Sequence, residues 1–255
     1  MDESLKFTDF LNHLFGAALA GLLEKIGFHA SVAGHPSPLD FNPAAPFTDT
    51  FALELGVALF LLTFFLIVRF TLNVEKPGPV QATAEMLHEF VGGQAEQIIG
   101  HGYERYQSFV TAVLIFVLSC NLLGLFPGLR TPTANPKVPL GIALLTFIYY
   151  NFHGLREQGP IGYLKHFLGP IWWISWLMFP IEIVSHLARI MSLTIRLYAN
   201  MFASDLLALV AFSMVPVILP VGLLALHFGV ALIQAYVFMV LAMIYMTIAV
   251  THEQH

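Results

Sequence analysis

The sequence predicts an all-α, polytopic membrane protein with five transmembrane helices and one interfacial amphipathic helix. Hydrophobic residues make up 57% of the 255 residues and charged residues only 11%, whereas soluble domains average about 25% charged residues. A chain of this composition cannot cover its folded surface with polar side chains. The apolar residues also cluster in runs that reach the length of about 20 residues needed to cross the hydrocarbon core. We expect the last two helices to be long, tilted and antiparallel.

Residues 1–46 are predicted to form an N-terminal extracytoplasmic segment, followed by a single membrane domain at 47–255. Residues 4–28 are mildly apolar but interrupted by charges, which favours a surface helix or an ordered tail. The prolines between residues 30 and 46 predict a loop. No basic region precedes the first apolar stretch, so we do not expect a cleaved signal peptide.

Three apolar runs predict the first three spans, at about 49–71, 106–127 and 138–154. The first ends where charged residues and prolines begin, and the second is uncharged throughout. A loop rich in Pro, Gly and Thr follows the second span. The polar stretch HGLREQGPIGYLKH, residues 153–166, is expected to form a reverse turn after the third span.

Residues 80–101 have a different pattern from the spans around them. Apolar residues fall on one face and glutamates on the other, as expected of a helix that lies at the membrane interface. A helix packed in a soluble loop is the alternative. The apolar face holds Leu87, Phe90, Val91 and Ile98, and the acidic face holds Glu85, Glu89 and Glu96.

The last two spans are predicted at about 174–212 and 221–250, with the turn between them near Pro216 and Pro220. At 1.5 Å per residue the final helix would rise about 45 Å, whereas the hydrocarbon core is about 30 Å thick. Helices of this length must tilt or extend beyond the lipid. No internal repeat is visible, which argues against an inverted-repeat transporter.

The cationic residues near the span ends are distributed unequally between the two sides of the membrane. The positive-inside rule therefore predicts a cytoplasmic C-terminus and an external N-terminus. One side holds Arg69, Lys76, Arg105, Arg156 and Lys165, and the other holds Arg130 and Lys137.

A polar stripe runs along the otherwise apolar span at 174–212. Glu182, Arg189 and Arg196 are each seven residues apart, nearly two helical turns, so they share one side of the helix. Charged groups inside membrane segments are costly and usually functional. The stripe also includes Ser185, His186, Ser192 and Asn200.

The antiparallel turn predicts which residues of the two last helices lie at the same depth. Asp205 and His227 are each eleven residues from Pro216, so they should be level. Gln234 falls close to Arg196. Asp205 and His227 can exchange protons, whereas Arg196 stays charged at any ordinary pH. No carboxylate of this chain is expected opposite Arg196, which suggests a partner on another subunit.

Structural interpretations of the same residues stay open at this point. Arg196 could form an ion pair with Glu182 or Asp205, although the spacing suits neither pair along one helix. Arg189 could extend its charge to the cytoplasmic interface, and Glu182 could stabilise local structure instead of lining a polar path. His227 could be a buried histidine whose hydrogen bonds are satisfied.

Several other classes of function are disfavoured. The small, scattered net charge of −5 gives no basic surface for nucleic acid. No glycine-rich phosphate loop is present, so no nucleotide site is expected. The eleven histidines are scattered without ligand spacing, and we expect no metal and no cofactor. A stand-alone transporter or channel and an intramembrane metal hydrolase remain as alternatives, which transport by the purified chain and elemental analysis would test.

Three segments resemble subunit a of the F-type ATP synthases, the membrane stator subunit. SLTIRLYANMFASDLL (192–207) resembles the signature of that family, and ALIQAYVFMVLAMIYMTIAV (231–250) resembles its final helix. NLLGLFPGLRTPTANP (121–136) resembles the loop after its second full span. The similarity covers about residues 45–255, and histidine at position 227 is more similar to the bacterial members.

The resemblance implies roles for individual residues. Arg196 matches the arginine that faces the ion-binding carboxylate of the rotating c ring, and Gln234 matches the glutamine beside it. Asp205 matches a position usually held by Glu, and it pairs with His227 on the outer access path, to which Asn200 also belongs. Some relatives carry an acidic residue near the position of Gly124, which this chain lacks. Glu182, with the adjacent Ser185 and His186, matches a region associated with proton access.

The mechanism implied by the resemblance is proton flow through two offset half-channels. Protons would reach and leave the c-ring carboxylate on either side of Arg196, and this flow would drive rotation of the rotor and ATP synthesis. The implied partners are the c ring, subunit b, other ATP synthase subunits and the lipid of a bacterial inner membrane. The chain itself would carry no site of nucleotide catalysis. The choice between H⁺ and Na⁺ depends largely on the binding site of the rotor.

Overall fold

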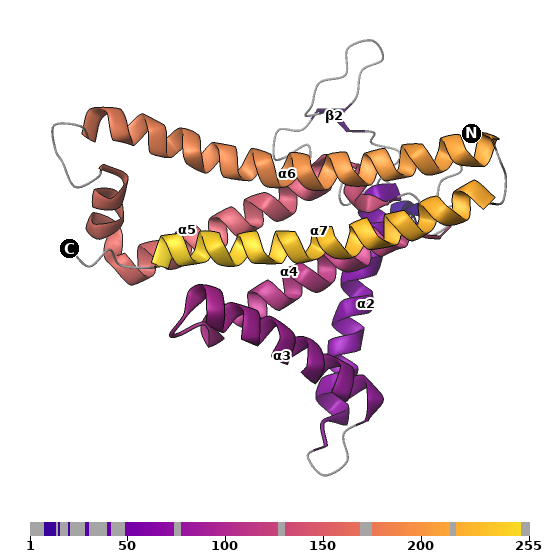
Figure 1. Cartoon of the computed structure of the whole chain (residues 1–255), viewed down its shortest axis with the longest axis horizontal. Coiled ribbons are helices and arrows are strands. Elements are labelled where there is room, and N and C mark those ends of the chain that lie inside the picture. The colour runs from indigo at the N-terminus through magenta and orange to yellow at the C-terminus, as the bar shows by residue number, and fades with distance from the viewer. Residues whose placement is uncertain are drawn as a thin grey trace. The chain divides into compact units, whose positions relative to one another are not determined.

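The computed structural model describes residues 8–13, 15, 20, 29–30, 40–41, 49–73, 78–126, 131–168, 175–214 and 218–250. Six long helices account for nearly all of these residues, which confirms the predicted all-α fold (Figure 1). They are α2 (Asp49–Thr71), α3 (Pro79–Ile99), α4 (Glu104–Leu123), α5 (Lys137–Leu168), α6 (Ser175–Met214) and α7 (Ile218–Val250). A short 3₁₀ helix, η1 (Pro132–Ala134), precedes α5.

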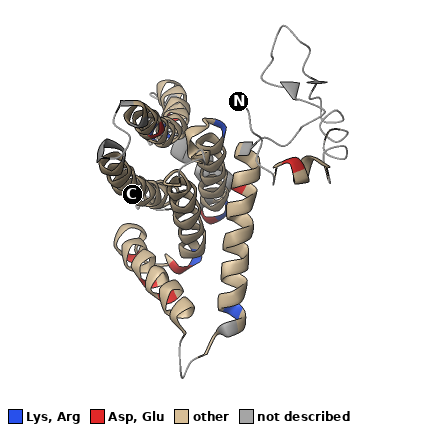
Figure 2. Ribbon diagram, turned by 90° about the vertical axis from the view of Figure 1, so that its right-hand side faces the viewer, with Lys and Arg blue, Asp and Glu red and all other residues tan. Residues whose placement is uncertain are grey.

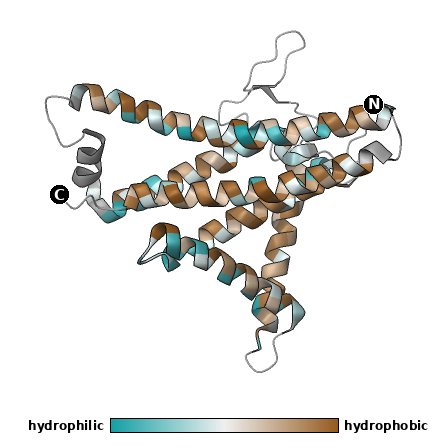
Figure 3. Ribbon diagram, in the orientation of Figure 1, coloured by the Kyte–Doolittle hydropathy of each residue, from teal (hydrophilic) through white to brown (hydrophobic). Residues whose placement is uncertain are grey.

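Five of the helices are long and apolar enough to cross a membrane, as predicted. Their candidate spans are Thr50–Phe70, Glu104–Leu123, Lys137–Glu157, Trp176–Ala211 and Val221–Val250. The ribbons carry few charged residues (Figure 2), and α7 is apolar along most of its length (Figure 3). Large side chains such as Phe60, Phe70 and Leu209 are 66%, 83% and 72% exposed. Apolar exposure on this scale requires a lipid or protein environment.

The chain divides into two compact units, residues 1–61 and 62–255, with the boundary inside α2. The first unit contains the start of α2 and a parallel pair of two-residue strands, β1 (His29–Ala30) and β2 (Asp40–Phe41), joined in the register His29 to Asp40. Residues 8–13, 15 and 20 are helical. The rest of the predicted 1–46 segment lies outside the described residues.

In the second unit, α7 packs against α3, α4, α5 and α6, and α6 also packs against α5 and η1. The α7 surface in these contacts consists of small residues and methionines. Ala235, Ala242, Met239 and Met243 are all at most 1% exposed. Small residues allow helix backbones to approach closely, and methionine fills the irregular space that remains. This packing fixes the register between α6 and α7, which lie side by side in opposite directions (Figure 1).

The predicted reverse turn at residues 153–166 is replaced by two helices that meet at a break. The break is at Gly159, where φ is 71° and ψ is 162°, and the second helix runs to Leu168. Glycine adopts this left-handed region without a steric penalty, and proline at the next position suits the first turn of the helix that follows. Polar composition indicated where the chain leaves the apolar layer, but the backbone there continues as a helix.

Two smaller predictions need adjustment. The second span ends at Leu123 rather than 127, and residues 124–126 form a turn. The amphipathic 80–101 segment is α3, and its apolar face packs on α4 and α7 through Val91, which is fully buried, while Leu87 and Ile98 are partly buried. Phe90 was predicted on the same face but is 47% exposed. The three glutamates of α3 are exposed, as expected.

Candidate functional site

Asp205 of α6 and His227 of α7 lie together in the structure, as the register counted from the sequence predicted. The Oδ1 atom of Asp205 lies 4.0 Å from Nδ1 of His227. The imidazole is 2% exposed, and its Nε2 atom lies 3.4 Å from the backbone oxygen of Asn121 on α4. A carbonyl oxygen only accepts hydrogen bonds, so this contact places a proton on Nε2. The lone pair of Nδ1 then faces the carboxyl group across 4.0 Å.

Three further residues, none of them predicted, complete the surroundings of Asp205. The hydroxyl of Thr131 donates a hydrogen bond of 2.8 Å to Oδ1 of Asp205. Next to it, the hydroxyl of Thr133 donates a bond of 2.7 Å to Oδ1 of Asn121. We call the five residues Asn121, Thr131, Thr133, Asp205 and His227 the Asp205 cluster. It is assembled from α4, η1 and its preceding residue, α6 and α7.

Glu182 lies in a second group of polar side chains nearer the start of α6. Its Oε1 atom is 3.4 Å from Nε2 of His186 and 3.8 Å from Nη2 of Arg189. The Nδ1 atom of His186 lies 2.9 Å from the hydroxyl of Tyr150 on α5. The guanidinium of Arg189 lies over the ring of Tyr245 on α7, 5.6 Å from its centroid. We call Glu182, His186, Arg189, Tyr150 and Tyr245 the Glu182 cluster.

These contacts decide several of the open alternatives. Arg189 contacts Glu182 and the ring of Tyr245, so its charge has partners inside the chain. His227 is buried and has partners, as the structural interpretation expected. One partner is the backbone oxygen of Asn121, and the other is the carboxyl group of Asp205. Tyr245 contributes packing and a cation–π contact, and Phe238 is fully buried in the core. Ser185 is part-exposed and has no hydrogen bond shown among the described residues.

Arg196 lies between the two clusters and is exposed on α6. Within the described part of the chain it forms no hydrogen bond or ion pair, because Glu182 and Asp205 are engaged elsewhere. The ion-pair interpretation of Arg196 is therefore wrong for this chain alone. Nine residues are about two and a half turns, so Arg196 and Asp205 point to opposite sides of α6.

The surface of α6 around Arg196 is built of small residues. Ala188, Ser192, Ala199 and Ala203 are all exposed and recur at helical spacing on the same side as the arginine. Bulkier exposed residues border this strip, including Met191 and Ile195. Small residues on an exposed membrane helix allow another helix to approach closely.

A hydrogen-bonded pair lies between the Asp205 cluster and Arg196. Nδ2 of Asn200 donates a bond of 2.8 Å to Oε1 of Gln234 on α7. Gln234 was predicted close to Arg196, and its partner is Asn200, one turn from the arginine. The Nε2 atom of Gln234 and the Nδ2 atom of Asn121 are buried without a hydrogen-bond acceptor among the described residues.

The sequence holds a signal for the missed residues. Thr131, Thr133 and Asn121 all lie in the segment 121–136, whose motif resembles a loop of the ATP synthase subunit, but that resemblance carried no role for them. Only the folded chain shows that this loop reaches α6, since Thr131 and Asp205 are 74 residues apart.

Comparison with known proteins identifies the family of the chain. The family described as "ATP synthase A chain" matches residues 51–247. The chain belongs to the ATP synthase A chain family. It is 50% identical over 252 residues to ATP synthase subunit a of Koribacter versatilis (strain Ellin345), with 99% of each chain covered. It is 41% identical to ATP synthase subunit a of Solibacter usitatus (strain Ellin6076), covering 82% of this chain and 90% of the relative.

The matched region contains both clusters and every residue between them. The similarity to the Koribacter versatilis protein extends over almost the whole chain, including the N-terminal residues that carry no diagnostic motif. Membership of the ATP synthase A chain family therefore applies to the membrane domain in full, with its five candidate spans.

Proposed function

We propose that this protein is the proton-conducting stator subunit of an F-type ATP synthase in a bacterial inner membrane. The single observation that carries the proposal is the exposed Arg196, which has no ion-pair partner among the described residues and lies on α6 between Glu182 and Asp205. Asp205 is nine residues from Arg196 and Glu182 is fourteen. Glu182 and Asp205 are therefore about 35 Å apart along α6, a distance close to the thickness of the hydrocarbon core.

Each cluster is suited to one end of a discontinuous proton path. At one end, a proton reaches the Asp205 carboxylate and passes to Nδ1 of His227. The distance of 4.0 Å exceeds a direct hydrogen bond, so a water molecule or a small side-chain movement completes the transfer. Asn200 and Gln234 lead from this cluster towards Arg196. At the other end, Glu182 and His186, with Ser185 beside them, accept the proton that leaves.

Arg196 separates the two paths. Its charge is fixed, so it attracts a carboxylate of a partner and favours the ionised form of that group. Because it stays protonated, it cannot pass a proton between the paths. We propose that the partner is the ion-binding carboxylate of the rotor c ring, which docks on the small-residue strip of α6. Each rotor carboxylate loses its proton as it meets Arg196, and the membrane potential drives the next step.

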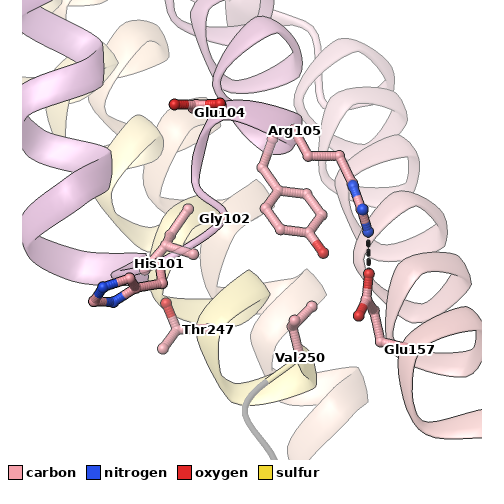
Figure 4. Close-up of a pocket in the computed structure, with 9 residues that line it drawn as sticks. His101, Gly102, Glu104, Arg105, Glu157, Thr247 and Val250 are labelled. Carbon is pink, nitrogen blue, oxygen red and sulfur yellow. Dashed lines mark hydrogen bonds and ion pairs between the residues drawn. The ribbon is translucent and has the colours of Figure 1, made fainter.

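The proposed orientation has the N-terminus outside and the C-terminus in the cytoplasm. Arg105 at the start of α4 forms an ion pair with Glu157 of α5 (Figure 4). This contact supports the assignment of residues 105 and 156 to one side of the membrane, as the charge bias requires. The Glu182 cluster then lies towards the cytoplasm and the Asp205 cluster towards the outside. Subunit b and the remaining ATP synthase subunits are proposed partners of the assembled complex.

The test is Arg196→Ala in the assembled ATP synthase. We expect no ATP-driven proton pumping by membrane vesicles, with normal amounts of the complex and normal ATP hydrolysis by its soluble part. Ala199→Cys should form a disulfide with a cysteine in the carboxylate-bearing helix of the rotor subunit. Coupled pumping at the normal rate by the Arg196→Ala complex would refute the proposal. Proton transport by the purified chain alone in liposomes would instead favour a stand-alone channel.

A further inference from the structure

The surroundings of Gly124 contain an arrangement that the proposed function does not use. A β-carbon added to Gly124 would lie 1.9 Å from the hydroxyl oxygen of Thr131 and 3.1 Å from Nε2 of His227. No atom can be added at the first of these distances unless the hydroxyl moves. The Thr131 hydroxyl therefore fills the space that any side chain at position 124 would take.

The glycine is required here for space and not for its backbone freedom. Gly124 caps α4 with φ −65° and ψ −12°, a right-handed conformation open to every residue. The space it leaves is bounded by His227 on one side and Thr131 on the other. A larger residue at 124 would compete with the Thr131 hydroxyl for the position beside the imidazole.

The position of the hydroxyl matters because of what it contacts. Thr131 is 3% exposed, and its hydroxyl donates to the same Oδ1 atom of Asp205 that faces Nδ1 of His227. Threonine has few side-chain rotamers, so a forced rotation would carry the hydroxyl away from the carboxylate. The bond to Asp205 therefore depends on the empty space at Gly124.

We propose that Thr131 is a positioning residue of the proton path, which holds the Asp205 carboxylate towards His227, and that Gly124 is the partner that leaves room for it. A protonated carboxyl group keeps acceptor capacity on its oxygens, so the Thr131 hydroxyl can donate to Oδ1 of Asp205 before and after the carboxyl group gives its proton to His227. The inference rests on the proposed function, because it assigns Thr131 to the transfer between Asp205 and His227.

The first set of variants changes the hydroxyl and keeps the volume. Thr131→Val should lower passive proton conduction through the assembled membrane sector about tenfold, the change that corresponds to losing one hydrogen bond to a charged group. Thr131→Ser keeps the hydroxyl and should conduct within about twofold of the unmodified protein. Thr146→Val is the matched control, since Thr146 is buried and its hydroxyl donates to the Ile142 carbonyl of its own helix.

The second set tests the spatial link between positions 124 and 131. Gly124→Ala should also reduce conduction about tenfold, because it displaces the Thr131 hydroxyl from Asp205. In a Thr131→Ala background the same substitution should cost no more than about twofold, as the hydroxyl it displaces is already gone. Equal losses in both backgrounds would overturn the coupling, and normal conduction by Thr131→Val would overturn the role of the hydroxyl.

The amount of assembled complex is measured for every variant, and conduction is expressed per complex, so a folding defect is not mistaken for a conduction defect. The Arg196→Ala complex separates this inference from the proposed function. If Arg196→Ala still pumps, the proposed function fails. If Arg196→Ala is inactive and Thr131→Val conducts normally, only the role of Thr131 fails.

Discussion

The two carboxylates of α6 that flank Arg196 are held in different ways. The Asp205 carboxylate contacts one hydroxyl and one imidazole, both contributed by other elements of the chain. The Glu182 carboxylate contacts His186 and Arg189, both from its own helix. Arg189 stays charged at any ordinary pH, so Glu182 always faces a cation. Asp205 faces groups that are neutral until His227 accepts a proton.

This difference indicates different tasks for the two clusters. We propose that Glu182, which faces a permanent cation, belongs to the exit path, where the proton passes on to water. Asp205, which contacts only a hydroxyl and an imidazole, belongs to the entry path, where it delivers the proton to His227. The Asp205 cluster also depends on tertiary contacts among four elements, whereas most of the Glu182 cluster is present in α6 alone.

The largest effect is expected from Asp205→Asn. The amide keeps the shape but cannot carry a proton, so passive proton conduction should fall more than about a hundredfold, of the order measured when a positioned proton-transfer group is removed. Asp205→Glu keeps the carboxyl group and is the matched control, with conduction reduced far less. Conduction close to normal in the Asn variant would show that protons bypass Asp205.

A smaller loss is expected from Glu182→Gln. His186 remains able to carry a proton in this variant, so proton conduction should fall about tenfold or less. The measurement is the same as for Asp205→Asn, in the same membranes. If the loss equals that of the aspartate variant, the two clusters do not differ as proposed. We expect the double variant Glu182→Gln with His186→Leu to lose nearly as much proton conduction as Asp205→Asn, because both proton carriers of the Glu182 cluster are removed.

Tyr150→Phe should have a moderate effect on stability. The hydroxyl of Tyr150, a residue that is 2% exposed, bonds to His186, and removing a buried partner costs about 1–3 kcal/mol. Thermal denaturation of the complex in detergent should report this loss. Tyr149→Phe is the matched control, because it removes the hydroxyl of the neighbouring tyrosine on α5, whose ring stacks on Phe109. Equal stability of the two variants would argue against a specific role for the Tyr150 hydroxyl.

The smallest effect is expected at the ion pair between Arg105 and Glu157. The Arg105 side chain is 65% exposed, and exposed ion pairs contribute about 0–1 kcal/mol. Arg105→Gln should therefore leave thermal stability almost unchanged. The pair borders a cavity of about 470 Å³ at the ends of α4 and α7 (Figure 4). A loss of proton conduction in this variant would mean that the cavity belongs to the exit path.

Prediction from sequence succeeded where composition decides the structure. Apolar runs located the five spans within a few residues, because a helix that crosses lipid must satisfy its backbone internally and present apolar side chains. Counting from Pro216 brought Asp205 level with His227, although residues 215–217 lie outside the described residues. The register works because two antiparallel helices joined by a short turn advance at the same rise per residue.

Prediction failed in one local stretch and where distant segments meet. The polar stretch at residues 153–166 was expected to form a reverse turn, but it holds two helices that meet at Gly159. Thr131 was passed over because no local pattern connects it to Asp205. Polarity shows which residues avoid lipid, but not which polar groups lie together.

By itself the sequence determined the membrane class, the spans and the isolated charge of Arg196, since these follow from hydropathy and helical periodicity along a single chain. The tertiary structure alone decided that Thr131 bonds to Asp205, that Gly124 leaves the space for this bond, and that Arg196 has no partner within the described residues. Those facts depend on side-chain packing between segments far apart in the sequence, such as Thr131 and Asp205, which are 74 residues apart, and no sequence period connects them. Arg196 depends on both. The sequence shows a charge that is costly to bury in a membrane, and the fold leaves this charge exposed on α6, where a partner can reach it.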